Sequence, residues 1–482
     1  MPLILGTNSI KDTGFEVANS CRFAVGDGAY LEKSYGTPTN AKIFGLSWWV
    51  KLGKAYDGSG SQDFWGERES RDNRVFMAIN ADGTFNYFEK NGGSVSLELK
   101  TNRLFRDNSA WFHFLLLGDT TQGTASNRLK LYINGVQETS FSTETYPAED
   151  YTFRLNANTT KYFGRIGLGG SLSTNYYDGY LAEAVFVDGT VTAHTDYGEF
   201  DEDSPRIWKP IDVSGLTFGD NGFYLDFEDS SNLGNDANGG TDFTETNLAT
   251  TDQSTDTPTN SFCTINPLDV PYGSVTLTEG NLVQVQTGGG SAYPYNRATM
   301  GVAKGKWYFE GKAVAISGDS VIGIASVAAS SATNALYRPA NNYAYYNHAS
   351  THGAYSDDAL VDSTDYDDYD DDDIISVAFD LDNNKLYFAK NGTWAHSGDP
   401  TSGATGTGAV SITAAASTVD GFYFPAAADY GGSPRTTWSM NFGSPAHTVS
   451  SGNADGNGYG NFEHAPPSGY YALCTKNLAE YG

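Results

Sequence analysis

The sequence predicts an all-β protein made of two antiparallel β-sandwiches joined by a polar connector. The composition favours strands and turns, because 31 Tyr and 27 Phe accompany 55 Gly but only 4 Met. Asn-Gly pairs at 134–135 and 391–392 each follow an apolar run, as in hairpins whose type I′ turn needs two residues with positive φ. A polar segment also separates two apolar regions of a chain whose 482 residues are enough for two domains.

The first region, residues 1–205, contains short apolar and aromatic runs separated by Gly, Asn, Asp and Ser. The run at 111–117 is apolar almost throughout, as is typical of a strand buried on both faces. The Asn134-Gly135 turn predicts a hairpin between the run before it and Val136. Strands are predicted at 44–50, 111–117, 129–133 and 176–189.

These runs, together with the closing sequence Asp178-Gly179-Tyr180-Leu181-Ala182-Glu183, resemble the laminin G-like, concanavalin A-like jelly-roll sandwich. The resemblance covers most of residues 1–205. It consists of strand and turn patterns, so it implies a fold but identifies no chemistry.

Residues 206–260 form the predicted connector. One short strand is expected at 222–227, and the segment beyond it consists mainly of Ser, Thr, Asn, Asp and Gly. Such a composition buries too little apolar surface to offset its own ordering entropy. We therefore predict a linker, which could also lie over a neighbouring domain.

The second region, residues 261–482, contains a further series of strands. They are predicted at 305–310, 374–382, 385–390, 421–425 and 438–443. Their order resembles that of the SPRY domain, a bent antiparallel β-sandwich. The sequence departs from that family at 365–373, where an acidic run stands in place of a short Gly-Asp turn.

The charge excludes two classes of partner. With 29 basic and 58 acidic residues, the net charge of -29 repels both nucleic acid and anionic membrane surfaces. No apolar stretch is long enough to insert into a membrane. The opening MPLILGTNSIKDTG lacks the features of a signal peptide, so we expect synthesis in the cytoplasm without a secretion signal.

One pattern in the first region is similar to a catalytic motif. Glu199, Asp201 and Asp203 alternate as in glucanases with a concanavalin-like fold, which use a pair of glutamates. Here the last residue is Asp, and Ser204-Pro205 follows at once, which favours a solvated acidic turn. We therefore predict that the protein is not an enzyme, and a glycan depolymerase remains the alternative.

The acidic run at 365–373 is a candidate cation site. Closely spaced carboxylates repel one another, and Ca²⁺ would relieve this repulsion because it accepts six to eight oxygen ligands. The predicted metal ligands are Asp367, Asp368, Asp370 and Asp371. The alternative is a solvated loop beside the strand that begins at Ile374.

Aromatic residues with polar neighbours suggest a glycan-binding surface in the second region. A sugar needs a flat ring for its C–H face and amide or carboxylate groups for its hydroxyls. The candidates are Tyr343, Tyr345, Tyr346, Tyr366, Tyr369 and Trp394. Such residues equally suit contacts with a protein.

The order of the two modules, with the opening MPLILGTNSIKDTGFEVANS, resembles structural proteins of tailed bacteriophages, particularly marine ones. The resemblance implies a virion protein assembled in the host cytoplasm, such as a tail or head fibre or an adhesin. Its partners would be other virion proteins, a host-surface glycan or protein receptor, and copies of itself, with a trimer among the candidates. The alternative is a capsid decoration protein that has only protein partners.

Overall fold

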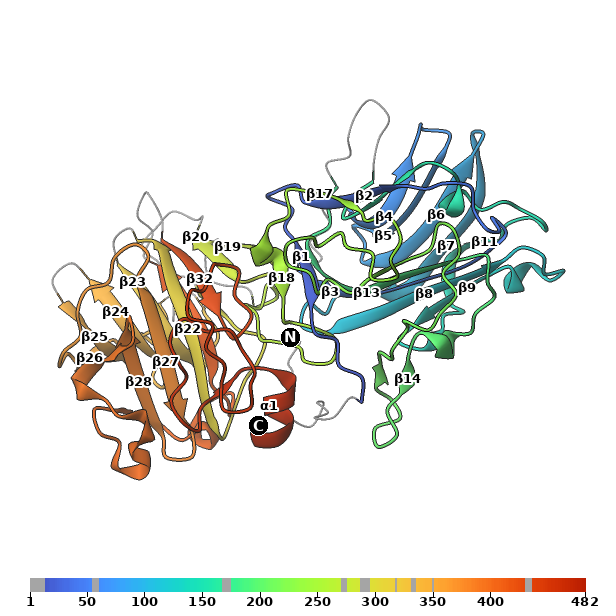
Figure 1. Ribbon diagram of the computed structural model, residues 1–482. Coiled ribbons are helices and arrows are strands. Elements are labelled where there is room, and N and C mark those ends of the chain that lie inside the picture. Colours follow the sequence, from blue (N-terminus) through green and yellow to red (C-terminus); the bar gives the residue numbers. More distant parts are fainter. Residues whose placement is uncertain are drawn as a thin grey trace. The chain divides into compact units, whose positions relative to one another are not determined.

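The computed structural model describes residues 14–53, 60–166, 175–269, 275–286, 295–316, 319–330, 335–348, 351–429 and 436–482. Its contacts divide the chain into two compact units, and the boundary lies between Thr259 and Asn260. Both units are built from antiparallel sheets (Figure 1), which confirms the predicted all-β class with two sandwiches. No helix within these ranges is long and apolar enough to cross a membrane.

The first unit contains two large sheets, each of eight strands within the described ranges. One has the order β10-β9-β8-β3-β13-β1-β18, with β16 also paired to β13. Its strands are β1 (Ser20–Phe23), β3 (Ile43–Leu52), β8 (Trp111–Asp119), β9 (Leu129–Ile133), β10 (Val136–Gln137), β13 (Gly179–Asp188), β16 (Phe223–Leu225) and β18 (Gln253–Ser254).

The other sheet has the order β11-β7-β6-β5-β4-β12-β2-β17. Its strands are β2 (Tyr30–Ser34), β4 (Gln62–Arg68), β5 (Arg74–Ile79), β6 (Thr84–Asn91), β7 (Ser94–Leu104), β11 (Phe141–Thr145), β12 (Thr160–Phe163) and β17 (Thr244–Thr246). A separate hairpin pairs β14 (Glu199–Phe200) with β15 (Trp208–Lys209).

The core of this unit lies between the two large sheets. Successive side chains of a strand point to opposite faces, so Phe114 and Leu116 of β8 enter the core while Leu115 packs on the outer face. The ring of Phe114 stacks on Phe85 of the facing sheet, with ring centroids 4.8 Å apart. Because Leu115 is also fully buried, the predicted burial of both faces of this strand is confirmed.

The segment predicted as a connector belongs to this first sandwich. Val213 and Phe218 cover Leu115 on the outer face of β8, and Phe243 joins the core between the sheets. Residues 244–246 and 253–254 add β17 and β18 to the two sheets. The polar composition did not indicate this role, because a few aromatic residues and paired aspartates are enough to anchor the segment to the sandwich.

The second unit also packs two sheets face to face. One has the order β19-β20-β32-β22-β27-β28-β29, with β30 on β28 and β33 parallel to β22. Its strands are β19 (Val275–Thr278), β20 (Val283–Gln286), β22 (Lys306–Ala315), β27 (Ile374–Asp380), β28 (Lys385–Lys390), β29 (Thr393–Trp394), β30 (Val410–Ser411), β32 (Thr437–Asn441) and β33 (Tyr471–Ala472).

The facing sheet has the order β21-β31-β23-β24-β25-β26. Its strands are β21 (Tyr295–Arg297), β23 (Ser320–Ala325), β24 (Tyr343–His348), β25 (Thr351–Ser356), β26 (Ala359–Asp362) and β31 (Phe424–Asp429). Tyr345 of β24 contacts Phe388 of β28 across the core, with ring centroids 5.8 Å apart. A short helix, α1 (Thr475–Tyr481), ends the chain and places Leu478 in the same core.

Glu183 is a buried acidic residue of the first unit, and its environment alters the pKa of its carboxyl. It lies in β13 at an irregularity of the pairing with β3, where its φ of 48° is unusual for a residue other than glycine. Its carboxyl accepts a hydrogen bond from the Tyr224 hydroxyl at 2.8 Å. Burial raises the pKa of Glu183 from 4.5 to about 8, and the hydrogen bond from Tyr224 offsets this only in part.

We expect Glu183→Gln to weaken the pH dependence of folding stability. The pKa of this carboxyl is higher in the folded than in the unfolded state, so the folded protein binds an additional proton between about pH 4.5 and pH 8. Its contribution to stability is therefore complete below this interval and is lost as the pH rises through it. Thermal unfolding near both ends of the interval measures the effect, and parallel profiles for parent and variant would contradict it.

Candidate functional site

The aromatic residues predicted to bind a ligand lie mainly in the core of the second unit. Tyr369 is fully buried, and the other four predicted tyrosines are at most 8% exposed. Trp394 is half-buried and packs edge-on against Tyr387. Tyr343, Tyr345 and Tyr346 are all on β24 and do not form the aromatic loop that the sequence suggested. Tyr343 and Tyr345 face the core between the sheets, whereas Tyr346 is buried on the opposite face of its sheet against Tyr337 and Tyr355. Their rings are therefore not accessible as a platform for a sugar.

The acidic run divides its side chains between the core and the solvent. Tyr366 and Tyr369 point inward, where both rings pack edge-on against Tyr345. The Tyr369 hydroxyl donates a hydrogen bond to the Ser320 carbonyl at 2.9 Å. These two tyrosines thus anchor the loop to the core, and the aspartates between them remain outside.

The four aspartates predicted to bind Ca²⁺ are exposed and do not converge. Among the residues that the structure describes, which include the whole run, no group of three or more His, Cys, Asp or Glu side chains could hold a metal ion. Asp371 instead accepts a hydrogen bond from the Ile316 backbone N–H at 2.6 Å. The predicted site, formed by Asp367, Asp368, Asp370 and Asp371, is thus not assembled.

Lysines from neighbouring strands compensate part of the charge of this loop. Lys312 pairs with Asp372 at 2.9 Å, and Lys390 pairs with Asp373 at 3.1 Å. Lys390 also lines a pocket of about 230 Å³ together with Tyr345 and Asp367. In this pocket, two of the predicted site residues, an aromatic and an acidic one, come together.

The alternating carboxylates of the first unit have a local structural role. Glu199 and Asp201 share one cation, with the Lys209 ammonium 3.4 Å and 3.5 Å from their respective oxygens. Asp201 also accepts a hydrogen bond from the Ser204 backbone N–H, which closes the turn between β14 and β15. Asp203 is exposed in that turn. Of the three carboxylates, only Asp203 lies in a solvated turn, whereas Glu199 is on β14 and Asp201 is buried.

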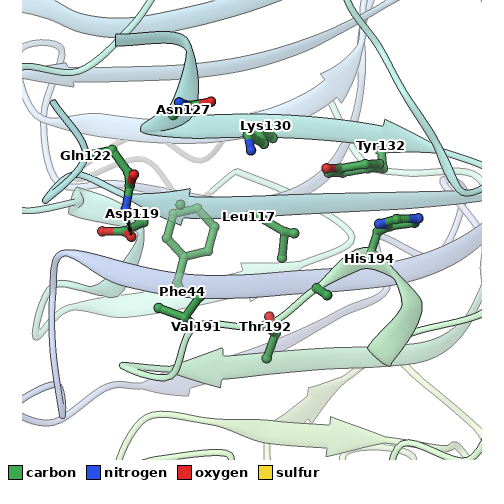
Figure 2. Close-up of a pocket in the computed structure, with 12 residues that line it drawn as sticks. Phe44, Leu117, Asp119, Gln122, Asn127, Lys130, Tyr132, Val191, Thr192 and His194 are labelled. Carbon is green, nitrogen blue, oxygen red and sulfur yellow. Dashed lines mark hydrogen bonds between the residues drawn. The ribbon is translucent and has the colours of Figure 1, made fainter. Parts of the chain in front are cut away.

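A pocket that the sequence did not indicate lies on the outer face of β8 and β9 in the first unit (Figure 2). It has a volume of about 390 Å³ and is open to solvent. Its apolar part consists of Phe44, Leu117 and Val191. Its polar part consists of Asp119, Gln122, Asn127 and Lys130. Tyr132 and His194 line one end, as Figure 2 shows.

The residues of this pocket come from three separate parts of the chain. Lys130 and Tyr132 occupy the outward positions of β9, since Leu129, Leu131 and Ile133 fill the core. The segment after β13 brings His194, whose ring stacks on Tyr132 at 4.9 Å with only 4° between the planes. Alternation along 129–133 could have shown that Lys130 and Tyr132 share a face, but no local signal indicates their partner His194.

Hydrogen bonding fixes the charge at one side of the pocket. Burial opposes ionisation of Asp119, but hydrogen bonds from Thr121 and Gln122 outweigh it and lower the pKa of this carboxyl. The Gln122 amide donates to Asp119 at 2.6 Å (Figure 2). No hydrogen bond or ion pair within the described ranges engages the side chains of Lys130 and Asn127. The pocket thus combines an anionic acceptor with unengaged donors beside an apolar floor.

No family model matches the chain, and no curated protein matches its sequence. Among solved structures, it is similar to a protein from Bacteroides ovatus whose proposed role is carbohydrate binding, with a TM-score of 0.32 and 13% identity. That match covers 48% of this chain and 58% of the other, so the chain spans little more than half of that protein.

Two further solved structures are similar to parts of the chain. The SPRY domain of human HERC1 has a TM-score of 0.25 and 14% identity, over 33% of this chain and 87% of that domain. A SAP-like pentraxin from Limulus polyphemus has a TM-score of 0.27 and 16% identity, over 38% of this chain and 82% of the pentraxin. At such identities and TM-scores, the similarities identify no ligand for this chain.

Proposed function

We propose that the protein is a non-enzymatic virion surface protein, a tail or head fibre or an adhesin, whose first unit binds a host-surface glycan. The pocket formed by β8, β9 and residues 191–194 is the proposed sugar site. The observation that carries this proposal is the amphipathic lining, with apolar side chains on one part and unengaged polar groups on another. Its place on a virion rests on the resemblance of the module order and the opening sequence to structural proteins of tailed bacteriophages.

The lining of this pocket suits a sugar ring better than a wholly apolar or a charged ligand. A pyranose has apolar C–H faces that can cover Leu117 and Val191, whereas the Phe44 ring is 2% exposed and belongs to the core. Its hydroxyls can donate to the Asp119 carboxylate and accept from Lys130. The opposite charges of these two groups favour a neutral ligand with many hydroxyls, because binding such a ligand adds no net charge to the pocket.

The exposed valine at the edge of the pocket favours the alternative of a capsid decoration protein. Val191 is 66% exposed, and an apolar residue on a rim is also compatible with a protein contact. A capsid decoration protein with only protein partners would use the same surface. The glycan depolymerase is a weaker alternative, because Glu199 and Asp201 both pair with Lys209.

We expect Lys130→Met and Asn127→Ala to weaken glycan binding by the full-length protein, each by roughly fivefold to tenfold, as for the loss of one hydrogen bond. Both side chains line the pocket, and neither is needed by the core. An array of neutral host-surface glycans identifies a ligand, and calorimetry then measures the affinity of each variant.

Matched controls lie outside the pocket. Lys304→Met and Asn238→Ala remove exposed side chains of the same two types and should leave the affinity unchanged. If pocket and control variants bind equally, the site is elsewhere. If no glycan binds and the protein is retained by purified virion proteins, the decoration alternative is correct. Release of reducing ends from a bound glycan would instead support the depolymerase.

A further inference from the structure

A second pocket opens on the other sheet of the first unit, at β4 and β5. It has a volume of about 200 Å³ and is lined by Ser61, Asp63, Arg68, Arg74, Phe76, Asn80, Ile166 and Asn175. This volume is below the range of roughly 300–1,000 Å³ that holds drug-sized ligands, and it is more suitable for a single small ring. In a chain with a net charge of -29, two arginines at one pocket are a notable local reversal of charge.

A buried carboxyl group with an unsatisfied oxygen lies in this pocket, and burial raises its pKa to about 7. Asp63 is only 1% exposed, and its Oδ2 has no hydrogen-bond partner. Its Oδ1 accepts a hydrogen bond from the Ser61 hydroxyl at 3.0 Å, and the Asn175 amide donates to the same hydroxyl at 3.1 Å. A buried polar atom without a partner costs free energy. A ligand hydroxyl that donates to Oδ2 would remove this cost.

An irregularity in the strand places this carboxyl group and an arginine on the same face. Asp63 and Arg68 are five residues apart, so a regular strand would direct them to opposite faces. The pairing of β4 with β5 shifts between Asp63 and Trp65. As a result, Asp63 is opposite Ala78 and Arg68 is opposite Arg74, two residues of β5 that are four apart and share a face.

The two arginines form a cross-strand pair of like charge, which is destabilising by itself. Burial, together with the nearby charges of Arg74 and Arg71, lowers the pKa of Arg68. Within the described ranges, none of the ion pairs involves Arg68, Arg71 or Arg74. The sandwich therefore holds an uncompensated positive cluster beside Asp63, and an anionic group would relieve it.

Aromatic packing fixes one of these arginines. The Arg74 guanidinium lies over the Phe88 ring, 5.1 Å from its centroid, and Phe88 in turn stacks on Phe76. The Arg74 side chain donates one hydrogen bond, to the Arg71 carbonyl at 3.3 Å, and its buried Nε has no partner. A guanidinium that is held in place and retains free donors is suited to bind a carboxylate or a sulfate group.

We propose that this pocket binds one sugar unit that carries an anionic group, either a uronate or a sulfate ester. Arg68 and Arg74 bind the anionic group, Asp63 accepts a hydrogen bond from a ring hydroxyl, and Phe76 contacts the C–H face. The site is independent of the pocket at Tyr132 and recognises a different class of sugar. Together, the two pockets would allow both sheets of one sandwich to contact an acidic polysaccharide.

The test is calorimetry of the full-length protein with glucuronic acid, galacturonic acid and a sulfated glucose, compared with glucose, galactose and inorganic sulfate. We expect at least one anionic sugar to bind more tightly than its neutral counterpart and than sulfate. Arg74→Met and Arg68→Met should each weaken this binding by roughly tenfold or more, as for loss of a hydrogen bond to a charged group. Asp63→Asn, which keeps the shape, should weaken it less.

Controls separate this proposal from a loss of folding and from the proposed function. Arg206→Met removes an exposed arginine elsewhere in the unit and should bind like the parent. Lys130→Met should also retain the anionic sugar, and unchanged thermal unfolding shows that each variant is folded. The proposal is overturned if no anionic sugar binds, if inorganic sulfate binds equally well, or if the Arg68 and Arg74 variants keep the parent affinity.

Discussion

A fragment that ends at residue 228 should show no cooperative unfolding transition, whereas residues 1–259 should unfold cooperatively as one unit. The difference lies in residues 229–259, which contribute β17 and β18 to the two sheets and Phe243 to the core between them. They also supply the carboxylates that pair with buried cations. The Lys51 ammonium is 2.6 Å from Asp256, and each side chain is only 1% exposed.

Loss of Asp256 alone should account for much of this effect. Removing one partner of a buried ion pair costs roughly 3–5 kcal/mol because the other charge stays buried and uncompensated. Asp256 also accepts a hydrogen bond from the Trp111 indole at 3.0 Å. Since whole domains are stable by roughly 5–15 kcal/mol, Asp256→Ala should remove a large part of the stability of the first unit.

Thermal and denaturant unfolding of both fragments and of the point variant measure these effects. Asp229→Asn is the control, because Asp229 is in the same segment but exposed and an amide oxygen can still accept the hydrogen bonds from Ser231, so it should change stability by less than roughly 0.5 kcal/mol. If residues 1–228 unfold as sharply and at the same temperature as 1–259, the last strands are dispensable, and residues 229–259 act as the linker that their composition suggests.

Tyr345→Ala and Tyr369→Ala should each destabilise the second unit by roughly 3–5 kcal/mol, the range for removing a large aromatic side chain from a core. Tyr345 contacts the rings of Tyr366, Tyr369 and Phe388. Tyr369 also packs against Trp438 of β32. These contacts join the two sheets to the acidic loop, so a cavity here weakens all three.

Thermal unfolding of the fragment 260–482 and of the full-length protein measures the loss of stability that each substitution causes. Tyr369→Phe is the control, because it keeps the ring and removes only the hydroxyl that donates to Ser320, at a cost of about 0.5–1.5 kcal/mol. If Tyr345 and Tyr369 instead bound a ligand, the opposite result would be observed. In that case, the alanine variants would keep the melting temperature of the parent and lose affinity for a glycan or a receptor.

The local sequence determined the strands and their turns. β28 begins and ends at the predicted residues 385 and 390, and Asn391 and Gly392 follow it with φ values of 47° and 80°, as the expected turn requires. The same holds for β9 and the turn at Asn134 and Gly135, with φ values of 48° and 74°. These features follow from residues that are neighbours in the chain, because strand periodicity and positive φ are local properties.

The role of the segment 229–259 depended on residues far away in the sequence. Asp236, Asp252 and Asp256 look like ordinary polar linker residues until they meet Lys33, Arg22 and Lys51, each more than 200 positions earlier in the chain. An isolated polar segment does not offset its ordering entropy, but a segment that neutralises buried cations on a preformed sandwich does. The composition of a segment shows whether it can become ordered by itself. It does not show whether buried cations elsewhere in the chain need its carboxylates.

The candidate sites were likewise decided by the tertiary structure. In the acidic run, the sequence placed Tyr366 and Tyr369 beside aspartates, and only the packing around Tyr345 directed the rings inward and the carboxylates outward. One pocket of the first unit arises where the segment after β13 places His194 on Tyr132, and the other where strand pairing brings Arg68 beside Arg74. Residue types and periods fix which elements form, whereas a site depends on the register and on long-range contacts, which no local pattern encodes.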